Sequence, residues 1–383
     1  MLFGSSAVQR MGAVASRAGA RALLVTDAGV RAAGHADVCE EVLVRSGVEV
    51  LTYDAVPENP SRGDARRLGA AAGPFSPDVV VAIGGGSAID CAKGGVLELT
   101  QPGGLDERHG RITLARPTLP IIAIPTTAGT GTECQSAALL SDDETGQKRA
   151  ILAPGLLPHL AVLDPSFTAS LPADVALAGG LDAVAHGVEA AVTRTQTERS
   201  RRYALAALRL VLPHIEAALD DPKAYAPRGA MLLGAALAGM AIEQSMLGAA
   251  HACSNPLTAQ LSVPHGIAVG LMLPAVVRHN AELPSCRATF ATIARDSSLS
   301  APGTDDEQAT LGLVSFLERL AARAAGSLSA LEESNLESCD RGRLATLAAG
   351  EWTGGFNPRE LSAPGYRTLY DGALSRFASG GAP

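Results

Sequence analysis

Short apolar runs, each ending in a polar turn, recur through the first half of the chain and are separated by stretches of helical periodicity. Such runs are typical of strands that are buried on both faces of a parallel sheet. The predicted strands are residues 21–27, 48–53, 78–83, 120–125 and 161–163. Their alternation with helices is the α/β pattern, so we expect a mainly parallel, Rossmann-like sheet that binds ligands at the carboxyl ends of its strands.

The second half of the chain spaces its apolar residues as helices do, without the alternation of a half-buried strand. Helices are predicted at residues 173–193, 198–219, 227–248, 267–279, 306–325 and 367–377. We therefore expect an all-α second domain. The boundary is placed near residue 168, which divides the chain into 1–168 and 169–383, and residues 378–383 are expected to be disordered.

The composition is that of a globular protein with large apolar cores. The 383 residues are enough for two domains, and 47% of them are apolar. A net charge of -8 without a basic run argues against nucleic-acid binding. Six scattered cysteines with no CxxC pair indicate a reducing compartment. The N-terminus lacks the order of a signal peptide, and the apolar residues 231–246 include Glu243, so we expect a cytoplasmic protein without a membrane span.

A glycine run, Gly84-Gly85-Gly86-Ser87, joins the clearest predicted strand to a helix. Backbone N–H groups at a helix start suit a diphosphate, and glycine lets phosphate oxygens approach the backbone. The spacing matches neither of the two common nucleotide motifs, so the turn alone is equally compatible with a ligand-free strand-to-helix connection. A second loop rich in Gly and Thr, residues 126–132, follows a neighbouring strand and favours the dinucleotide site.

Two charged residues are further candidates for cofactor contacts. Asp27 ends the first strand, where its carboxylate would accept hydrogen bonds from ribose hydroxyls and repel a 2′-phosphate. An ordinary helix N-cap is the alternative for Asp27. Lys148 lies in a polar stretch, residues 141–149, that is predicted to be a turn between two strands, where a solvated charge is the alternative.

A carboxylate and three imidazoles are the candidate metal ligands in the second half. Asp182 and His186 are four residues apart and share one face if the segment is helical. With His251 and His265 they make a set that suits iron(II) or zinc. A single such histidine is more often a satisfied core residue, but the surrounding sequence is almost free of other charge. Buried ionisable groups persist mainly when they are paired or bound to metal.

The other histidines are assigned no ligand role. His279 is interpreted as a cation at a helix C-terminus. Four more lie in turn-like or charged contexts and are predicted to be surface residues: His35, His109, His159 and His214.

Together these motifs resemble the iron-dependent (group III) alcohol dehydrogenases, which share their fold with glycerol dehydrogenase and dehydroquinate synthase. The resemblance covers nearly the whole chain. It rests on the metal segment, on Asp90 and Lys93, and on residues 2–4, 25–27, 57–60, 84–87, 125–133 and 354–359.

The resemblance implies that Asp182, His186, His251 and His265 bind Fe2+ or Zn2+ and that the protein is a homodimer. It implies NAD rather than NADP as the cofactor. The implied dinucleotide contacts are Asp27, Asn59, Gly85, Gly86, Ser87, Asp90, Thr126, Thr127, Thr130 and Lys148. The chain departs from the family at Asn255, where a second histidine is usual four residues after the third ligand. Because Asn cannot exchange a proton near pH 7, this departure concerns the proton route or the substrate.

We predict reversible hydride transfer between NAD(H) and a small alcohol or aldehyde, in a cleft between the halves, with the metal polarising the substrate oxygen. A maleylacetate-reductase-like enzyme, which need not depend on metal, is disfavoured by the retained ligand set. A lyase like dehydroquinate synthase would need basic residues for a carboxylated substrate, yet residues 179–191 and 247–264 contain no Lys or Arg. A non-enzymatic binding protein is the least favoured alternative.

Overall fold

The computed structural model describes residues 1–106, 108–144 and 146–377, which form two compact units. The first unit contains Met1–Leu171 and also Asp221–Gly239. The second contains Pro172–Asp220 and the chain from Met240 onward. The predicted disordered tail lies outside the described residues. The domain boundary near residue 168 stays a prediction.

A six-stranded sheet is the centre of the first unit, and every neighbouring pair of its strands is parallel. In spatial order the strands are β1 (Leu2–Phe3), β9 (Leu160–Leu163), β6 (Ile121–Pro125), β4 (Val79–Gly84), β2 (Arg21–Val25) and β3 (Glu49–Tyr53). The five predicted strands are confirmed. The edge strand β1 was not predicted, because two residues are too few to show a periodic pattern.

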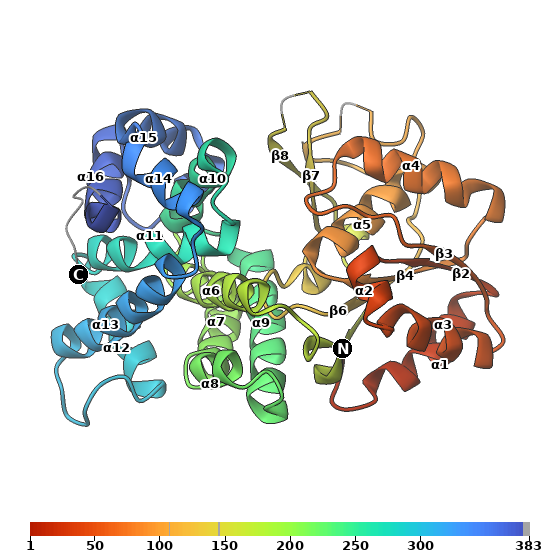
Figure 1. Ribbon diagram of the computed structural model, residues 1–383, viewed down its shortest axis with the longest axis horizontal. Coiled ribbons are helices and arrows are strands. Elements are labelled where there is room, and N and C mark those ends of the chain that lie inside the picture. Colours follow the sequence, from red (N-terminus) through yellow and green to blue (C-terminus); the bar gives the residue numbers. More distant parts are fainter. Residues whose placement is uncertain (107, 145, 378–383) are drawn as a thin grey trace. The chain divides into compact units, whose positions relative to one another are not determined.

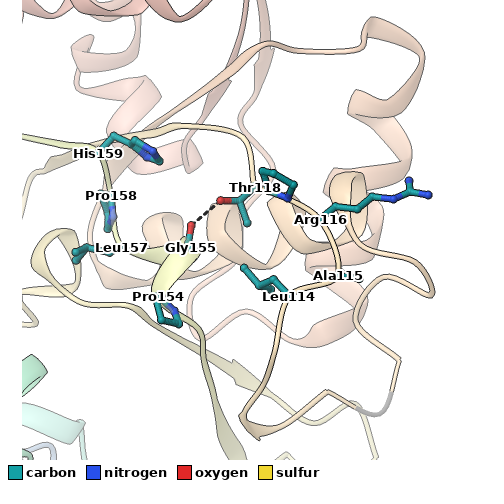
Figure 2. A pocket seen from close by; sticks show the side chains of 10 residues that line it. Leu114, Ala115, Arg116, Thr118, Pro154, Gly155, Leu157, Pro158 and His159 are labelled. Atoms are coloured by element: carbon teal, nitrogen blue, oxygen red, sulfur yellow. Dashed lines mark hydrogen bonds between the residues drawn. The ribbon is translucent and has the colours of Figure 1, made fainter.

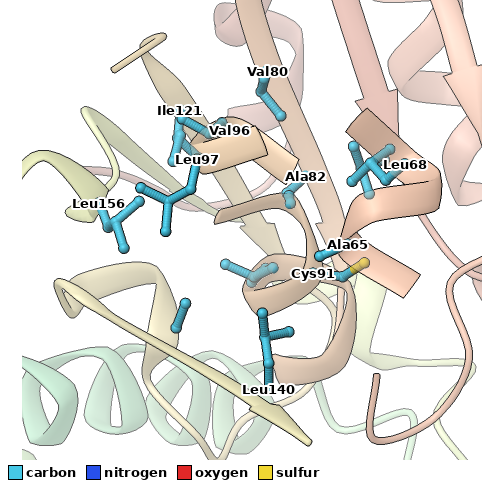
Figure 3. Close-up of a cluster of buried hydrophobic side chains, with 14 of the residues drawn as sticks. Ala65, Leu68, Val80, Ala82, Cys91, Val96, Leu97, Ile121, Leu140 and Leu156 are labelled. Carbon is cyan, nitrogen blue, oxygen red and sulfur yellow. The ribbon is translucent and has the colours of Figure 1, made fainter. Parts of the chain in front are cut away.

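Helices cover both faces of this sheet. The helices of the first unit's α/β part are α1 (Met11–Ala18), α2 (Ala28–Ala32), α3 (His35–Arg45), α4 (Arg62–Ala72) and α5 (Gly86–Thr100). Successive strand residues point to opposite faces. Leu23 and Val80 therefore pack with residues of α4 and α5, and Figure 3 shows Val80 in this cluster with Leu68 and Cys91. Leu24 and Val81 pack with residues of α1 and α3, the helices on the other side of the sheet (Figure 1). Burial on both faces explains why the strands are continuous apolar runs.

A small second sheet confirms the predicted turn around Lys148. Strands β7 (Ala137–Ser141) and β8 (Lys148–Leu152) are antiparallel, and β5 (Gly110–Arg111) pairs with β8. Ser141 pairs with Lys148 at the end of this hairpin that adjoins its connecting turn.

Helix α9 (Tyr225–Ser245) is long and apolar enough to cross a membrane by length and composition. It is a core helix instead, as predicted for this apolar segment. A Cβ added to Gly239 would lie 2.4 Å from the carbonyl oxygen of Gly131, so the helix backbone rests directly on the loop that follows β6.

Among its described residues the second unit contains helices joined by turns and no strands, which confirms the predicted fold class. Its α-helices outside α9 are α6 (Ala173–Ala190), α7 (Glu198–Val211), α8 (Ile215–Asp220), α10 (Ala249–Leu261), α11 (His265–Asn280), α12 (Pro284–Asp296), α13 (Asp306–Ala325), α14 (Ala330–Ser338), α15 (Arg341–Gly350) and α16 (Ala363–Ala373). The single helix predicted at 198–219 is two helices, because Pro213 lies in the break and lacks the backbone donor that a continuous helix needs. Helix α10 was not predicted, since Pro256 interrupts its pattern.

Candidate active site

Helix α6 carries three buried ionisable side chains on one face. Asp182 and His186 are one turn apart, as their spacing predicted, and the Nε2 atom of His186 lies 3.2 Å from Oδ1 of Asp182. Glu189 follows three residues later. None of the three is more than 5% exposed.

The other two imidazoles come from the starts of two further helices. His251 lies in the first turn of α10, with Nε2 3.3 Å from Asp182 Oδ1, and its ring stacks on that of His186 at 5.0 Å between centroids. His265 is the first residue of α11, with Nε2 4.0 Å from the same oxygen, and it forms the more exposed side of the cluster. Three imidazole nitrogens thus converge on one carboxylate oxygen.

The charges of this cluster fit a divalent cation. Burial alone would raise the pKa of Asp182, but His186, His251 and His265 hold that pKa well below its usual range. Ligand atoms of Asp182, His186 and His251 all lie within 4.8 Å of one another. One carboxylate oxygen and imidazole nitrogens at this separation are a donor set that first-row metals accept.

Glu189 is a buried carboxylate beside this cluster to which the sequence alone assigned no role. Its Oε2 lies 2.5 Å from Nδ1 of His251, and its Oε1 accepts a hydrogen bond from the backbone N–H of Ala250 at 2.6 Å. A carboxylate that holds the Nδ1–H of a histidine leaves the Nε2 lone pair to face a metal. The signal was its spacing, three residues after His186 on the same helix face.

Close backbone packing brings His265 to Asp182. A Cβ added to Gly266 would lie 2.0 Å from the carbonyl oxygen of Ala178, and one added to Gly270 would lie 2.8 Å from the side chain of Leu181. Helix α11 therefore lies directly against the backbone of α6.

We expect Gly266→Val to destabilise the protein by about 3 kcal/mol, at the upper end of overpacking, because the obstacle is a backbone carbonyl that cannot rotate away. The measurement is the urea unfolding midpoint of the metal-free protein. Gly350→Ala is the control, since a Cβ there meets no described atom within 4 Å. Unfolding of Gly266→Val at the wild-type midpoint would contradict this packing.

The predicted cofactor loops lie at the carboxyl ends of adjacent strands in the first unit. Gly85 caps the start of α5, directly after β4. A Cβ added to Gly85 would meet the Thr127 side chain at 3.3 Å, and one added to Gly86 would meet Thr130 at 2.9 Å. The threonine-rich loop thus covers the glycine turn, and the N–H of Thr126 joins the two by donating to Gly84 O at 2.9 Å.

Asp27 serves as the helix cap that was its alternative role. Its Oδ1 accepts a hydrogen bond from the N–H of Val30 at 2.9 Å and so caps α2. Its Oδ2 lies beside the glycine turn, 3.1 Å from a Cβ added to Gly84. One carboxylate oxygen is therefore structural, while the other lies at the predicted cofactor loop.

Asn59, Ser87 and Lys148 gather near the same turn. The N–H of Asn59 donates to Oγ of Ser87 at 3.1 Å, and Ser141, the strand partner of Lys148, donates its hydroxyl to the carbonyl of Asn59 at 3.4 Å.

Asp90 lies underneath the threonine-rich loop. Its carboxylate is 6% exposed and accepts a hydrogen bond from Thr132 Oγ1 at 2.6 Å. The buried Lys93, 3.8 Å away, donates to the carbonyls of Thr132, Gln135 and Ala137. Asp90 and Lys93 therefore hold the loop from below.

His279 and Asn255, two positions singled out in the sequence, each lie beside a charged side chain. His279 is at the end of α11, where burial and the neighbouring Arg359 lower its pKa. The amide of Asn255 donates to Oε2 of Glu351 at 2.8 Å.

A surface hollow of about 780 Å³ lies near the amino ends of strands β6 and β9 (Figure 2). Its lining includes Leu114, Arg116, Thr118, Pro154, Leu157 and His159. These residues precede β6 and β9, so the hollow is at the amino ends of the strands, where parallel sheets do not usually bind cofactors. We assign it no part in the active site.

The parallel α/β unit with its glycine turn, and the helical unit with its carboxylate and imidazole cluster, define a metal-dependent dehydrogenase. Residues 1–165 match the family described as iron-containing alcohol dehydrogenase. Residues 176–374 match the C-terminal region of the Fe-containing alcohol dehydrogenase family. The chain belongs to the iron-containing alcohol dehydrogenase family, which confirms the resemblance.

Similarity to individual dehydrogenases supports membership of this family. The 1,3-propanediol dehydrogenase of Klebsiella pneumoniae is 32% identical over 344 residues, which are 89% of this chain and 88% of that protein. The bifunctional aldehyde-alcohol dehydrogenase AdhE of Escherichia coli is 32% identical over 372 residues, but the chain spans only 41% of its length. The crystal structure of a 1,3-propanediol oxidoreductase superposes with a TM-score of 0.91 and 30% identity over 97% of both chains.

Proposed function

We propose that this protein is an NAD-dependent, metal-dependent alcohol dehydrogenase that interconverts a small alcohol and its aldehyde. The observation that carries the proposal is the convergence of three imidazole nitrogens on Asp182 Oδ1. Family membership and the names of relatives such as 1,3-propanediol dehydrogenase support the same substrate class. In this proposal residues 1–168 bind the dinucleotide and residues 169–383 bind metal and substrate. A homodimer in the cytoplasm is part of the proposal.

Asp182, His186, His251 and His265 would hold the ion, Fe2+ or Zn2+. Bound there, it would supply a Lewis acid that stabilises negative charge on the substrate oxygen. Glu189 orients His251 through its Nδ1–H. When NAD is bound, its nicotinamide would accept the hydride that leaves the alcohol carbon, and the hydroxyl proton would pass to solvent.

The dinucleotide site is proposed at the two contacting loops of the first unit. The backbone N–H groups of Gly85, Gly86 and Ser87 open α5 and suit the diphosphate. Thr127 and Thr130 cover this turn. The Oδ2 atom of Asp27, beside Gly84, would accept hydrogen bonds from ribose hydroxyls and repel a 2′-phosphate, which favours NAD over NADP.

Asn255 does not carry the proton in this scheme. Its amide has no group that titrates near pH 7, and it is engaged with Glu351.

We expect metal affinity to rise about tenfold per pH unit between pH 7 and 9. Burial would lower the pKa of His251, but Glu189 and Asp182 outweigh it and raise that pKa to about 9. Below this pH the imidazole carries an extra proton that a metal must displace, so acid opposes binding and the gain ends above pH 9. Calorimetric titration with Zn2+ in buffers of different ionisation enthalpy counts the protons released. Glu189→Gln should make the dependence shallower, whereas affinity independent of pH would contradict this coupling.

The proposed function is tested by metal analysis of the purified protein together with a screen for NADH oxidation over small aldehydes. Stoichiometric iron or zinc and net NADH turnover are expected. A lyase or a binding protein would bind NAD without net turnover. The proposal would be overturned if protein loaded with Fe2+ and protein loaded with Zn2+ both bound NAD but oxidised no NADH with any aldehyde of the panel.

A further inference from the structure

Asn357 is a buried, hydrogen-bonded residue of the helical unit that directly follows the 3-10 turn Trp352–Phe356. Asn357 is 1% exposed, and its amide uses both ends. Its Oδ1 accepts from Asn280 Nδ2 at 3.0 Å, and its Nδ2 donates to Asn280 Oδ1 at 2.9 Å and to the carbonyl of Arg359 at 2.8 Å. A buried amide pair with reciprocal bonds holds both of its segments in one register.

The same oxygen of Asn357 reaches the start of α10. It accepts from the backbone N–H of Ala249 at 3.3 Å, two residues before His251. Glu189 Oε1 accepts from the next N–H, that of Ala250. A Cβ added to Gly248 would meet Glu189 Oε1 at 2.9 Å and Asn357 Oδ1 at 3.1 Å, so the two acceptors close on this first turn from adjacent positions.

Helices α10 and α11, which carry His251 and His265, are both bonded to Asn357, and the chain after α6 is bonded to the preceding residue, Phe356. Helix α10 is bound through Ala249, and α11, which begins with His265, is bound through its last residue, Asn280. Beyond the end of α6, the N–H of Arg194 donates to the carbonyl of Phe356 at 2.9 Å.

We propose that Asn357 is a positioning residue of the metal centre, which acts through the first turn of α10 to set the place of His251. This inference rests on the proposed metal site. Loss of the Asn357 side chain frees the N–H of Ala249 and breaks the pair with Asn280, while the bond from the N–H of Ala250 to Glu189 remains. Partners that orient metal ligands typically contribute 10- to 100-fold to metal affinity.

The test measures Zn2+ affinity of the full chain, by competition with a chromogenic chelator, and the unfolding midpoint of the metal-free protein. Asn357→Ala is expected to lower the affinity about 10- to 100-fold. Asn280→Ala, which keeps the bond to Ala249, should lower it less. The matched control is Thr310→Val, which removes a buried hydroxyl that bonds the carbonyls of Arg287 and Asp306 away from Asn357. We expect it to lower the unfolding midpoint and leave Zn2+ affinity within about threefold, because it touches no ligand-bearing turn.

Zn2+ affinity of Asn357→Ala within threefold of wild type would overturn the inference. So would an equal loss of affinity in Thr310→Val, because the effect would then be general destabilisation. If Asn357→Ala does not fold, Asn357→Leu decides, because leucine has a similar volume and lacks the oxygen that accepts from Ala249. Affinity of that variant within threefold of wild type overturns the inference. A wild-type chain that binds no metal would overturn the proposed function itself. If the wild type binds Zn2+ and the Asn357 variants bind it equally well, only the role of Asn357 is overturned.

Discussion

Asp182→Ala is expected to remove bound metal and to lower turnover by about a thousandfold or more, since metal stabilisation of a charged transition state amounts to several kcal/mol. Asp182 Oδ1 lies within 4.0 Å of Nε2 of all three histidines, so its loss removes the one carboxylate ligand that the three imidazoles share. NAD affinity should stay within a few-fold of wild type, because the glycine and threonine loops belong to the other compact unit. Metal content, NADH turnover and NAD binding are measured on the same preparation.

The control for this variant is Asp174→Ala. Asp174 is an exposed carboxylate in the first turn of the same helix, so its removal changes the charge of α6 without touching the cluster. His265→Ala should act in the same direction as Asp182→Ala. Retention of both metal and turnover in either ligand variant would rule out the metal role.

Asp27→Ser should shift the cofactor preference toward NADP by about 10- to 100-fold, which corresponds to about 1.4 to 2.7 kcal/mol of charge repulsion removed. Serine keeps an oxygen that can cap α2 through the N–H of Val30, so the helix start is preserved while the charge beside Gly84 is lost. The measurement is the ratio of kcat/KM values for NADH and NADPH with one aldehyde.

Asp305→Ser is the control that separates the change in cofactor preference from the effect of replacing a helix-capping Asp by Ser. Asp305 caps α13 in the second unit by accepting from the N–H of Gln308, and its replacement should leave the cofactor ratio unchanged. An unchanged ratio in Asp27→Ser would show that Asp27 is a helix cap without a part in cofactor selection.

Local sequence patterns were enough to predict the α/β class, the five central strands and the helical second half. The strands of the sheet are buried on both faces, so their apolar runs are continuous and short, and such runs are visible without any knowledge of their neighbours. The pairing of Asp182 with His186 was predictable for the same reason, since a spacing of four is a property of the helix itself.

The approach of His251 and His265 to that pair was decided by tertiary packing. Neither the bond from His251 to Glu189 nor the backbone contact at Gly266 follows from a local period, because each joins residues that are distant in the chain. Tertiary packing also decided that Asp221–Gly239 belongs to the first unit, although the residues before and after it belong to the second. Periodicity along the sequence determines which face of an element is buried, whereas the partner of that face depends on contacts that no short stretch of sequence contains.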